Sequence, residues 1–186
     1  MPTSSLQPTL WRTCRVIANR TRLEMFGLLL QRPGQTVSAV AEHLNQPLPV
    51  TSQSLRALEA RGLLVSRRVG RSVEYRITPT TGDGHPSHLV AALRLIFQRG
   101  TEPVEASFRL ATAFTHPRRI EIFRTIQAEP RTLAQIRAAT HISSWALLRH
   151  LRKLEVRGFV TCRLGLYVAT KGVDGLGREL ARLAVE

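Results

Sequence analysis

The octapeptide LRALEARG at residues 55–62 recurs as LRKLEVRG at residues 151–158, with six of the eight positions identical. The two octapeptides lie 96 residues apart. When the sequence is compared with itself at a distance of 97 residues, five upstream residues also align with identical or similar partners: Trp11 with Phe108, Arg12 with Arg109, Arg22 with Arg119, Glu24 with Glu121 and Phe26 with Phe123. A single one-residue gap reconciles the two offsets. Ordered matches so far apart predict a repeated unit of about 70 residues.

The first copy has a readable order of elements. Apolar residues at helical spacing predict a helix from Leu10 to Ala18, and Asn19 is placed to cap a second helix that ends before Pro33. Thr36 opens a short third helix, and a fourth helix has Thr51, Leu55 and Leu58 on its inner face. Gly62 stops it. The alternation of residues 72–77 predicts a β-hairpin with its turn at Gly70 and Arg71.

The second copy repeats this order with helices over 108–115, from Pro117, over 133–140 and over 144–157, the last capped by Ser143. Gly158 precedes a shorter hairpin within 159–170. Two short helices followed by a β-ribbon form a winged helix-turn-helix, whose second helix enters the major groove of DNA. The predicted fold class is therefore mainly α with small β-hairpins (α+β), with two such domains in tandem.

Several stretches resemble winged-helix repressors of the ArsR type. They are IANRTRLEMFGLLL, TVSAVAEHL, SQSLRALEARGLLVSRRVGRSVEYRIT, AFTHPRRIEIFRTI and LLRHLRKLEVRGFV, which span about three quarters of the chain. The resemblance implies operator binding by symmetric dimers of single winged helices. A tandem copy departs from that pattern and implies a covalent pseudo-dimer, paired through helices at 86–98 and 104–115. The expected domains are 1–81, a linker with an interdomain helix at 82–102, and 103–186.

The formal net charge is +14, with 27 Lys and Arg against 13 Asp and Glu. Such a field attracts polyanions, so double-stranded DNA is the expected partner. Only Lys153 and Lys171 are lysines, and coding bias also produces an arginine excess of this kind. Charge alone therefore carries limited weight.

The first copy offers a reading helix and a cationic wing. The outward residues of its fourth helix are Val50, Ser52, Gln53 and Arg56. Gln53 is suited to adenine and Arg56 to phosphate. The hairpin adds Arg67, Arg68 and Arg71 around Gly70, a tip suited to the DNA backbone or minor groove. The alternative without a DNA-binding role is that the outward helix residues are simply solvated and that the hairpin arginines only keep an edge strand from pairing with other chains.

The second copy has a shorter hairpin that keeps only Arg163 near its tip, and its helix places Trp145, Leu148, Arg149 and Arg152 on one face. That face could pack on a terminal helix at 174–185, on a second chain or partner, or on thymine methyls. The candidate DNA-binding residues of this copy are Ser144, Trp145, Arg149, His150, Arg152, Lys153 and Arg163. We expect Arg149, Arg152 and Lys153 to meet phosphates and His150 to donate to DNA, with the first copy as the main reader.

The sequence predicts no metal site, cofactor or catalytic centre. Asp83-Gly84-His85 resembles the start of one metal site of ArsR-type sensors, but Ile96 and Arg99 cannot supply the distal ligands. Cys14 and Cys162 match no disulfide or metal-ligand spacing. No histidine is spaced with an acid or nucleophile as catalysis requires.

No export signal is visible at the start, and the most apolar segment, LVAALRLIF, is interrupted by Arg94. We therefore expect a cytoplasmic, nucleoid-associated protein. The predicted function is sequence-specific DNA binding in transcription regulation, as a repressor. The alternatives are a tandem winged-helix scaffold of the chromosome-segregation kind and a replication initiator. Homodimerisation stays open.

Overall fold

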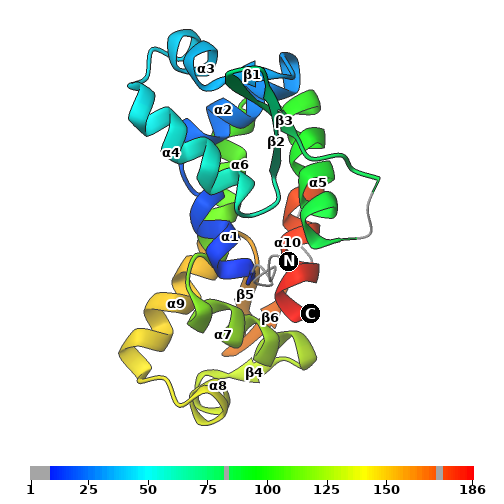
Figure 1. Cartoon of the computed structure of the whole chain (residues 1–186). Coiled ribbons are helices and arrows are strands. Elements are labelled where there is room, and N and C mark those ends of the chain that lie inside the picture. The colour runs from blue at the N-terminus through cyan, green and yellow to red at the C-terminus, as the bar shows by residue number, and fades with distance from the viewer. Residues whose placement is uncertain (1–8, 82–83, 171–173) are drawn as a thin grey trace. The chain divides into compact units, whose positions relative to one another are not determined.

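The computed structural model describes residues 9–81, 84–170 and 174–186 (Figure 1). It divides into two compact units. The first unit comprises Val16–Phe108, and the second comprises Arg109–Glu186 together with the described residues up to Arg15. Both are mainly helical, and each contains one small three-stranded antiparallel sheet. Within the described residues, no helix is both long and apolar enough to cross a membrane.

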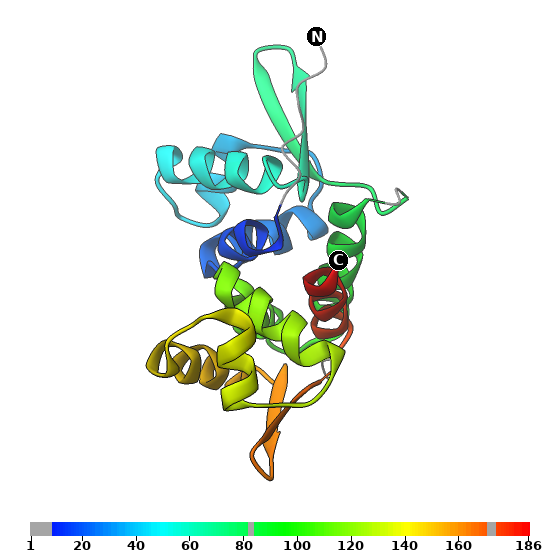
Figure 2. The ribbon, with the colours of Figure 1, turned by 90° about the horizontal axis from the view of Figure 1, so that it is seen from below.

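The first unit follows the predicted order of elements. They are α2 (Arg20–Gln31), β1 (Gln35–Thr36), α3 (Val37–His43), α4 (Leu48–Glu59), β2 (Leu64–Val69), β3 (Ser72–Ile77) and α5 (His85–Arg99). The sheet has the strand order β1-β3-β2. The β2–β3 ribbon, called the first wing, projects beyond the helices of its unit (Figure 2).

Local chemistry sets the ends of these elements. The Asn19 side chain accepts a hydrogen bond from the backbone N–H of Arg22 at 3.0 Å, and Thr36 accepts one from Ala39 at 3.2 Å. Each side chain therefore satisfies an N–H group that a helix start leaves unpaired. Gly62 has a φ of +68°, a left-handed conformation that glycine adopts without a Cβ penalty. It releases the chain from α4 into the first wing.

The core of the first unit lies among α2, α3, α4, α5 and the sheet. Its buried apolar side chains include Leu23, Phe26, Leu29, Val40, Leu55, Leu58, Leu64, Tyr75, Leu89 and Leu93. Phe26 of α2 and Phe97 of α5 have ring centroids 5.7 Å apart. The α5 helix was expected to belong to a linker at 82–102. Its buried residues instead make it part of the compact first unit.

The second unit has a matching order of elements. They are α7 (Pro117–Ala128), β4 (Arg131–Thr132), α8 (Leu133–Thr140), α9 (Ser144–Val156), β5 (Val160–Arg163), β6 (Leu166–Ala169) and α10 (Gly175–Val185). The sheet order β4-β6-β5 corresponds to that of the first unit. The β5–β6 ribbon, called the second wing, is four residues long in each strand, compared with six in each strand of the first wing.

The core of the second unit is built around three aromatic rings. Phe114 and Phe159 have centroids 4.7 Å apart, and Phe114 and Phe123 lie 5.3 Å apart, both in edge-to-face geometry. All three side chains are fully buried. Edge-to-face packing places the positive ring edge against the negative face, which adds to the gain from burial. The α10 helix lies against α7, where Arg124 Nε donates to the Ala184 carbonyl at 2.6 Å.

Two helices contain the points where the chain passes from one unit to the other. Helix α1 (Leu10–Ile17) belongs to the second unit up to Arg15, and α6 (Pro103–Ala111) belongs to the first unit up to Phe108. This grouping differs from the domain limits expected from the sequence, in which the first domain ends at residue 81 and the second begins at residue 103. The physical reason is that the first part of α1 packs with residues of the second unit, whereas the first part of α6 packs with residues of the first unit. Cys14 is fully buried near Arg119, and Arg20 Nε donates to Glu105 Oε2 at 2.8 Å.

Three local predictions differ in detail. The helix predicted over 108–115 ends at Ala111 and continues as a 3₁₀ turn, Thr112–Phe114. Ser143 is the N-cap residue of α9, but its side chain makes no capping hydrogen bond. The terminal helix begins at Gly175, with Asp174 as its cap, accepting from the N–H of Gly177 at 2.6 Å.

Candidate nucleic-acid interface

Helix α4 has one anchored face and one exposed face. Thr51, Ser54, Leu55 and Leu58 are buried, and the Thr51 hydroxyl donates to the Pro47 carbonyl at 3.1 Å. The four predicted reading residues lie on the other side: Val50, Gln53 and Arg56 are exposed, and Ser52 is half-buried. The anchored face fixes the rotation of the helix, so these four side chains share one accessible surface.

The end of α4 is tied to the first wing. Ser66 Oγ donates to Glu59 Oε1 at 2.5 Å. Burial raises the pKa of Tyr75, Glu59 raises it further, and a hydrogen bond from Arg56 lowers it. Arg56 therefore lies near the Tyr75 hydroxyl, on the side of α4 that faces the first wing.

The first wing presents its arginines on two different faces. In the antiparallel register Arg67 lies opposite Glu74 and Arg68 lies opposite Val73. Successive residues of a strand point to opposite faces, so Arg68 shares the face of Tyr75 and Ser66, which is the α4 side, whereas Arg67 points away from it. Arg71 lies in the exposed turn beside Gly70. The three arginines thus surround the tip and do not form a single row.

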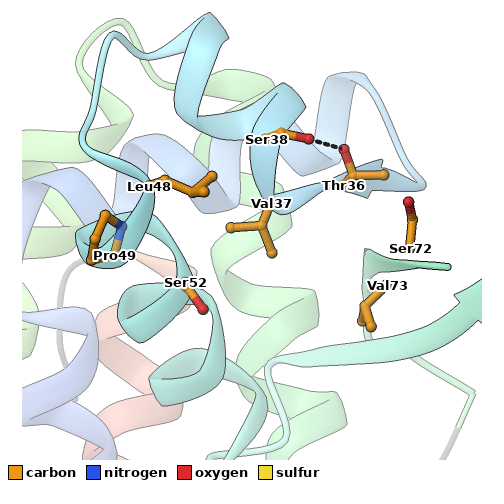
Figure 3. Close-up of a pocket in the computed structure, with 8 residues that line it drawn as sticks. All are labelled: Thr36, Val37, Ser38, Leu48, Pro49, Ser52, Ser72 and Val73. Atoms are coloured by element: carbon orange, nitrogen blue, oxygen red, sulfur yellow. Dashed lines mark hydrogen bonds between the residues drawn. The ribbon is translucent and has the colours of Figure 1, made fainter.

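A hollow of about 380 Å³ lies between the starts of α3 and α4 and the first wing (Figure 3). It combines hydroxyl and apolar side chains: Thr36, Val37, Ser38, Leu48, Pro49, Ser52, Ser72 and Val73. The Thr36 and Ser38 hydroxyl oxygens are 3.1 Å apart. None of these side chains titrates near neutral pH, so the hollow offers shape and hydroxyl groups rather than catalysis. Sequence reasoning missed Leu48 and Pro49, although they directly precede Val50.

Helix α9 exposes a face that is both apolar and cationic. Trp145 is 72% exposed and Leu148 47%, and Ser144, Arg149, Arg152 and Lys153 are exposed as well. The Arg149 guanidinium lies 4.9 Å from the centroid of the Trp145 ring, within the range of a cation–π interaction. These exposures exclude the alternative in which Trp145 and Leu148 pack on the terminal helix.

His150 does not lie on this face, which corrects the expectation that it donates to DNA. Its side chain is 7% exposed, and its ring centroid is 4.9 Å from that of His116. His116 in turn accepts a hydrogen bond at Nδ1 from the backbone N–H of Arg118. On a 3.6-residue helix, His150 follows Leu147 and precedes Leu154 on the buried stripe. His150 is a core residue of the second unit.

The burial of His150 predicts a pH-dependent stability. Burial and the neighbouring His116, Arg119 and other cations lower the pKa of His150 to about 4. The unfolded chain, with a histidine pKa of about 6.5, takes up a proton that the folded unit resists. We therefore expect the contribution of His150 to stability to be constant above about pH 6.5 and to fall by roughly 1–3 kcal/mol as the pH decreases toward 4.

Urea unfolding followed by circular dichroism at several pH values measures this dependence. The matched control is His150→Phe, which keeps a ring beside His116 and cannot take up a proton. The variant should flatten the part of the pH profile between 6.5 and 4. An identical profile for both proteins would contradict the assignment.

The tip of the second wing is a two-residue turn, Leu164 and Gly165, between β5 and β6. Leu164 has a φ of +50° and Gly165 a φ of +79°. Leucine rarely adopts the left-handed region, because its Cβ approaches the neighbouring carbonyl oxygen. Leu164 is fully exposed, and Arg163 beside it is also exposed. An apolar side chain therefore occupies a strained and solvated position.

Relief of this strain should stabilise the protein. We expect Leu164→Asn to raise the free energy of unfolding by about 0.5–1 kcal/mol, because asparagine tolerates the left-handed region. Thermal unfolding by calorimetry measures the change. Leu166→Asn is the control, since Leu166 lies in β6 of the same ribbon without a positive φ. A lower melting temperature for Leu164→Asn than for the unaltered protein would contradict the strain argument.

The segment that contains α3 and α4 has a counterpart among known protein families. Residues 17–67 match the family model of a helix-turn-helix domain. The match supports a winged helix-turn-helix DNA-binding domain in the first unit, with α3 and α4 as its two short helices. No curated protein and no solved structure is significantly similar to the chain.

The positive charge is divided unequally between the first unit, which contains the helix-turn-helix domain, and the second unit. The first unit holds 11 basic and 7 acidic residues of the sequence, a net charge of +4. The second unit holds 16 basic and 6 acidic residues, a net charge of +10. The second unit therefore carries most of the positive field, although its wing keeps fewer arginines than that of the helix-turn-helix domain.

The described residues contain no group of three or more His, Cys, Asp and Glu side chains arranged to hold a metal ion. Asp83, from the motif Asp83-Gly84-His85, lies outside the described residues. Both cysteines are unpaired: Cys14 is buried and Cys162 is exposed. Burial raises the pKa of the Cys14 thiol well above its usual range, and Arg119 lowers it slightly. Cys14 is thus an apolar core residue rather than a thiolate nucleophile.

Proposed function

We propose that the protein is a sequence-specific double-stranded-DNA-binding regulator of transcription, acting at the chromosome as a repressor that occupies its operator. The observation that carries the proposal is the exposed face of α4, which lies within the segment that matches a helix-turn-helix domain and beside the arginine-bearing first wing. A helix of this kind fits the major groove of B-DNA, and the wing reaches the adjacent backbone or minor groove.

The residues of the first unit divide into reading and positioning roles. Gln53 is suited to a bidentate contact with adenine, and Val50 to a thymine methyl group. Ser52 lies at the hollow beside the reading face. Arg56 stays near the wing and is suited to phosphate, as are Arg68 and Arg71. Arg67, on the face of the wing away from α4, is also suited to phosphate.

We also propose that the second unit is a further winged helix of the ArsR-like kind, so that the chain is a covalent pseudo-dimer. Repeated contacts at the aligned positions support this. Arg22 donates to the Val16 carbonyl at 3.4 Å, and Arg119 donates to the Ala113 carbonyl at 2.5 Å, 97 residues later. Thr36 and Thr132 cap α3 and α8 in the same way.

The sheet and helix ends follow the same repeat. In the first sheet Gln35 is registered with Tyr75, and in the second Arg131 is registered with Tyr167. Gly62 and Gly158 both end their helices with positive φ, at +68° and +76°. Equal register and equal helix ends are expected of two copies of one ancestral unit. The helix-turn-helix match itself covers only residues 17–67.

The second unit is proposed to supply electrostatic attraction more than base reading. Arg149, Arg152, Lys153 and Arg163 are exposed and suited to phosphates, and Ser144 lies at the start of α9. Trp145 is suited to a thymine methyl group. The net charge of +10 on this unit supports a large share in phosphate binding.

One observation favours a second candidate, a scaffold that binds another protein. Trp145 and Leu148 are large, exposed and close together on α9, and aromatic residues are enriched at protein interfaces. The cationic residues around them favour DNA. The two candidates make different predictions for sequence selection.

Selection of bound fragments from a pool of random duplexes tests the proposed function. We expect an enriched sequence whose affinity falls steeply as the salt concentration rises from about 50 to 200 mM, because neutralised phosphates release counterions. Gln53→Ala should relax the preference at one position of the site, whereas Arg152→Ala should weaken binding to all sequences alike. A pool without enrichment would overturn sequence-specific binding and favour the scaffold.

A further inference from the structure

We propose that the second wing inserts Leu164 into the minor groove as an apolar wedge that kinks the duplex. The inference rests on the proposed function and adds to it a change in DNA shape. Leu164 is a fully exposed residue in the two-residue turn at the tip of the second wing.

The first observation is the cost of placing leucine at this tip. Its φ of +50° is unfavourable for a branched apolar side chain, and complete exposure adds no burial that would offset the strain. Gly165 follows with a φ of +79°. A turn of this shape is formed more readily by asparagine and glycine. The leucine at this position therefore indicates a role in a state where its side chain becomes buried.

The second observation is the position of Leu164 in the ribbon. The two residues between β2 and β3 are Gly70 and Arg71, and the two residues between β5 and β6 are Leu164 and Gly165. Each tip projects beyond the helices of its own unit (Figure 2). The minor groove is about 6 Å wide, so a narrow ribbon tip can enter it with one side chain at a time. The first wing offers a cation there and the second wing offers an isobutyl group.

The third observation is the charge around this tip, which selects DNA as the occupant. Arg163 is adjacent and exposed, and the whole unit has a net charge of +10. A second copy of the chain would bring the same charges together, which is unfavourable. A polyanion complements them. Proteins that bind the minor groove insert leucine and similar side chains between base steps and kink the duplex by about 20–90°.

Fluorescence energy transfer between dyes at the two ends of a selected duplex of roughly 30 base pairs measures the bend, and the same samples give the affinity. We expect the unaltered protein to shorten the end-to-end distance. Leu164→Asn should abolish the bend and weaken binding on the order of tenfold, because the turn is kept while the wedge is removed. Leu164→Met, which keeps an apolar side chain, should retain most of the bend.

Arg163→Gln separates the wedge from charge: it should weaken binding and reduce the salt dependence while the bend persists. A straight duplex in the complex with the unaltered protein, or an equal bend with Leu164→Asn, would overturn the wedge and leave the proposed function intact. Failure of the unaltered protein to bind any selected duplex would instead overturn the proposed function itself.

Discussion

Simultaneous replacement of Arg67, Arg68 and Arg71 by alanine should weaken binding to a selected duplex by on the order of 100-fold at about 100 mM salt. Each arginine that meets a phosphate releases condensed counterions, so the slope of log affinity against log salt should also become shallower, by about 0.9 for each phosphate that is no longer neutralised. All three side chains are exposed around the tip of the first wing, so the folded structure should be unaffected. Fluorescence anisotropy at four or five salt concentrations gives both quantities.

A charge-matched variant separates local contacts from the general field. Arg99, Arg109 and Arg178 are exposed arginines of three helices outside α4 and the first wing, and their replacement removes the same formal charge. This control should change the affinity far less. Equal decreases in affinity for the two triple variants would show that the protein attracts DNA by net charge alone and that the first wing has no specific part.

Phe123→Ala should lower the free energy of unfolding by about 3–5 kcal/mol. The ring is fully buried and packs edge-to-face with Phe114 at 5.3 Å and with Phe159 at 6.3 Å. Its removal leaves a cavity at the centre of the second unit. Such a decrease is a large fraction of the stability of a typical domain. Urea unfolding followed by circular dichroism measures it.

Two further variants keep this prediction informative if Phe123→Ala is too unstable to purify. Phe123→Leu should show an intermediate decrease in stability, because part of the apolar volume is kept. Phe97 is only half-buried against Phe26, so Phe97→Ala should lower the free energy of unfolding by less than Phe123→Ala does. A decrease below about 1 kcal/mol for Phe123→Ala would contradict the aromatic core described for this unit.

Much of the fold was predictable because local chemistry and the repeat indicate the same elements. Asn19, Thr36 and Gly62 are found at the helix ends where the sequence places them. The turn at Gly70 and Arg71 also lies where the alternation of residues 72–77 puts it. Caps, stops and tight turns depend on nearest neighbours in the chain, so one sequence is enough to locate them.

The exchange of helices between the units could not be predicted in this way. Whether the first part of α1 packs with the residues that follow it or with residues about 100 positions later is a long-range choice, and the apolar stripe of the helix is the same in both cases. Cys14 is buried and belongs to the second unit, although it precedes the first unit in the chain. Periodicity shows which face of a helix is buried, not what covers it.

The candidate site was predicted in part. The exposed positions of Val50, Gln53 and Arg56 were expected from the inner face of α4, and the structure places all three at the surface. The prediction that His150 contacts DNA is wrong, because its place on the buried stripe with Leu147 and Leu154 outweighs the polarity of its side chain. The alternation of a strand already places Arg67 and Arg68 on opposite faces, but which of the two faces α4 depends on how the ribbon packs on that helix, which adjacent letters in a sequence do not reveal.

Leu164 could not be singled out from the sequence for a related reason. A leucine between Arg163 and Gly165 has no distinctive pattern, and its exposure and its positive φ become visible only in three dimensions. The hollow beside α4 is similar, since its lining comes from four elements, β1, α3, α4 and β3. Such features are properties of the assembled units.

Hydroxyl-radical footprinting of the full chain on a selected duplex tests most directly the central claim, that both units bind DNA. If they do, two unequal protected patches should lie about one helical turn apart, because each recognition helix needs its own major-groove face. Arg149→Ala combined with Arg152→Ala should weaken only one patch, and the triple replacement of Arg67, Arg68 and Arg71 only the other. A single protected patch, unaffected by the changes in α9, would contradict the claim.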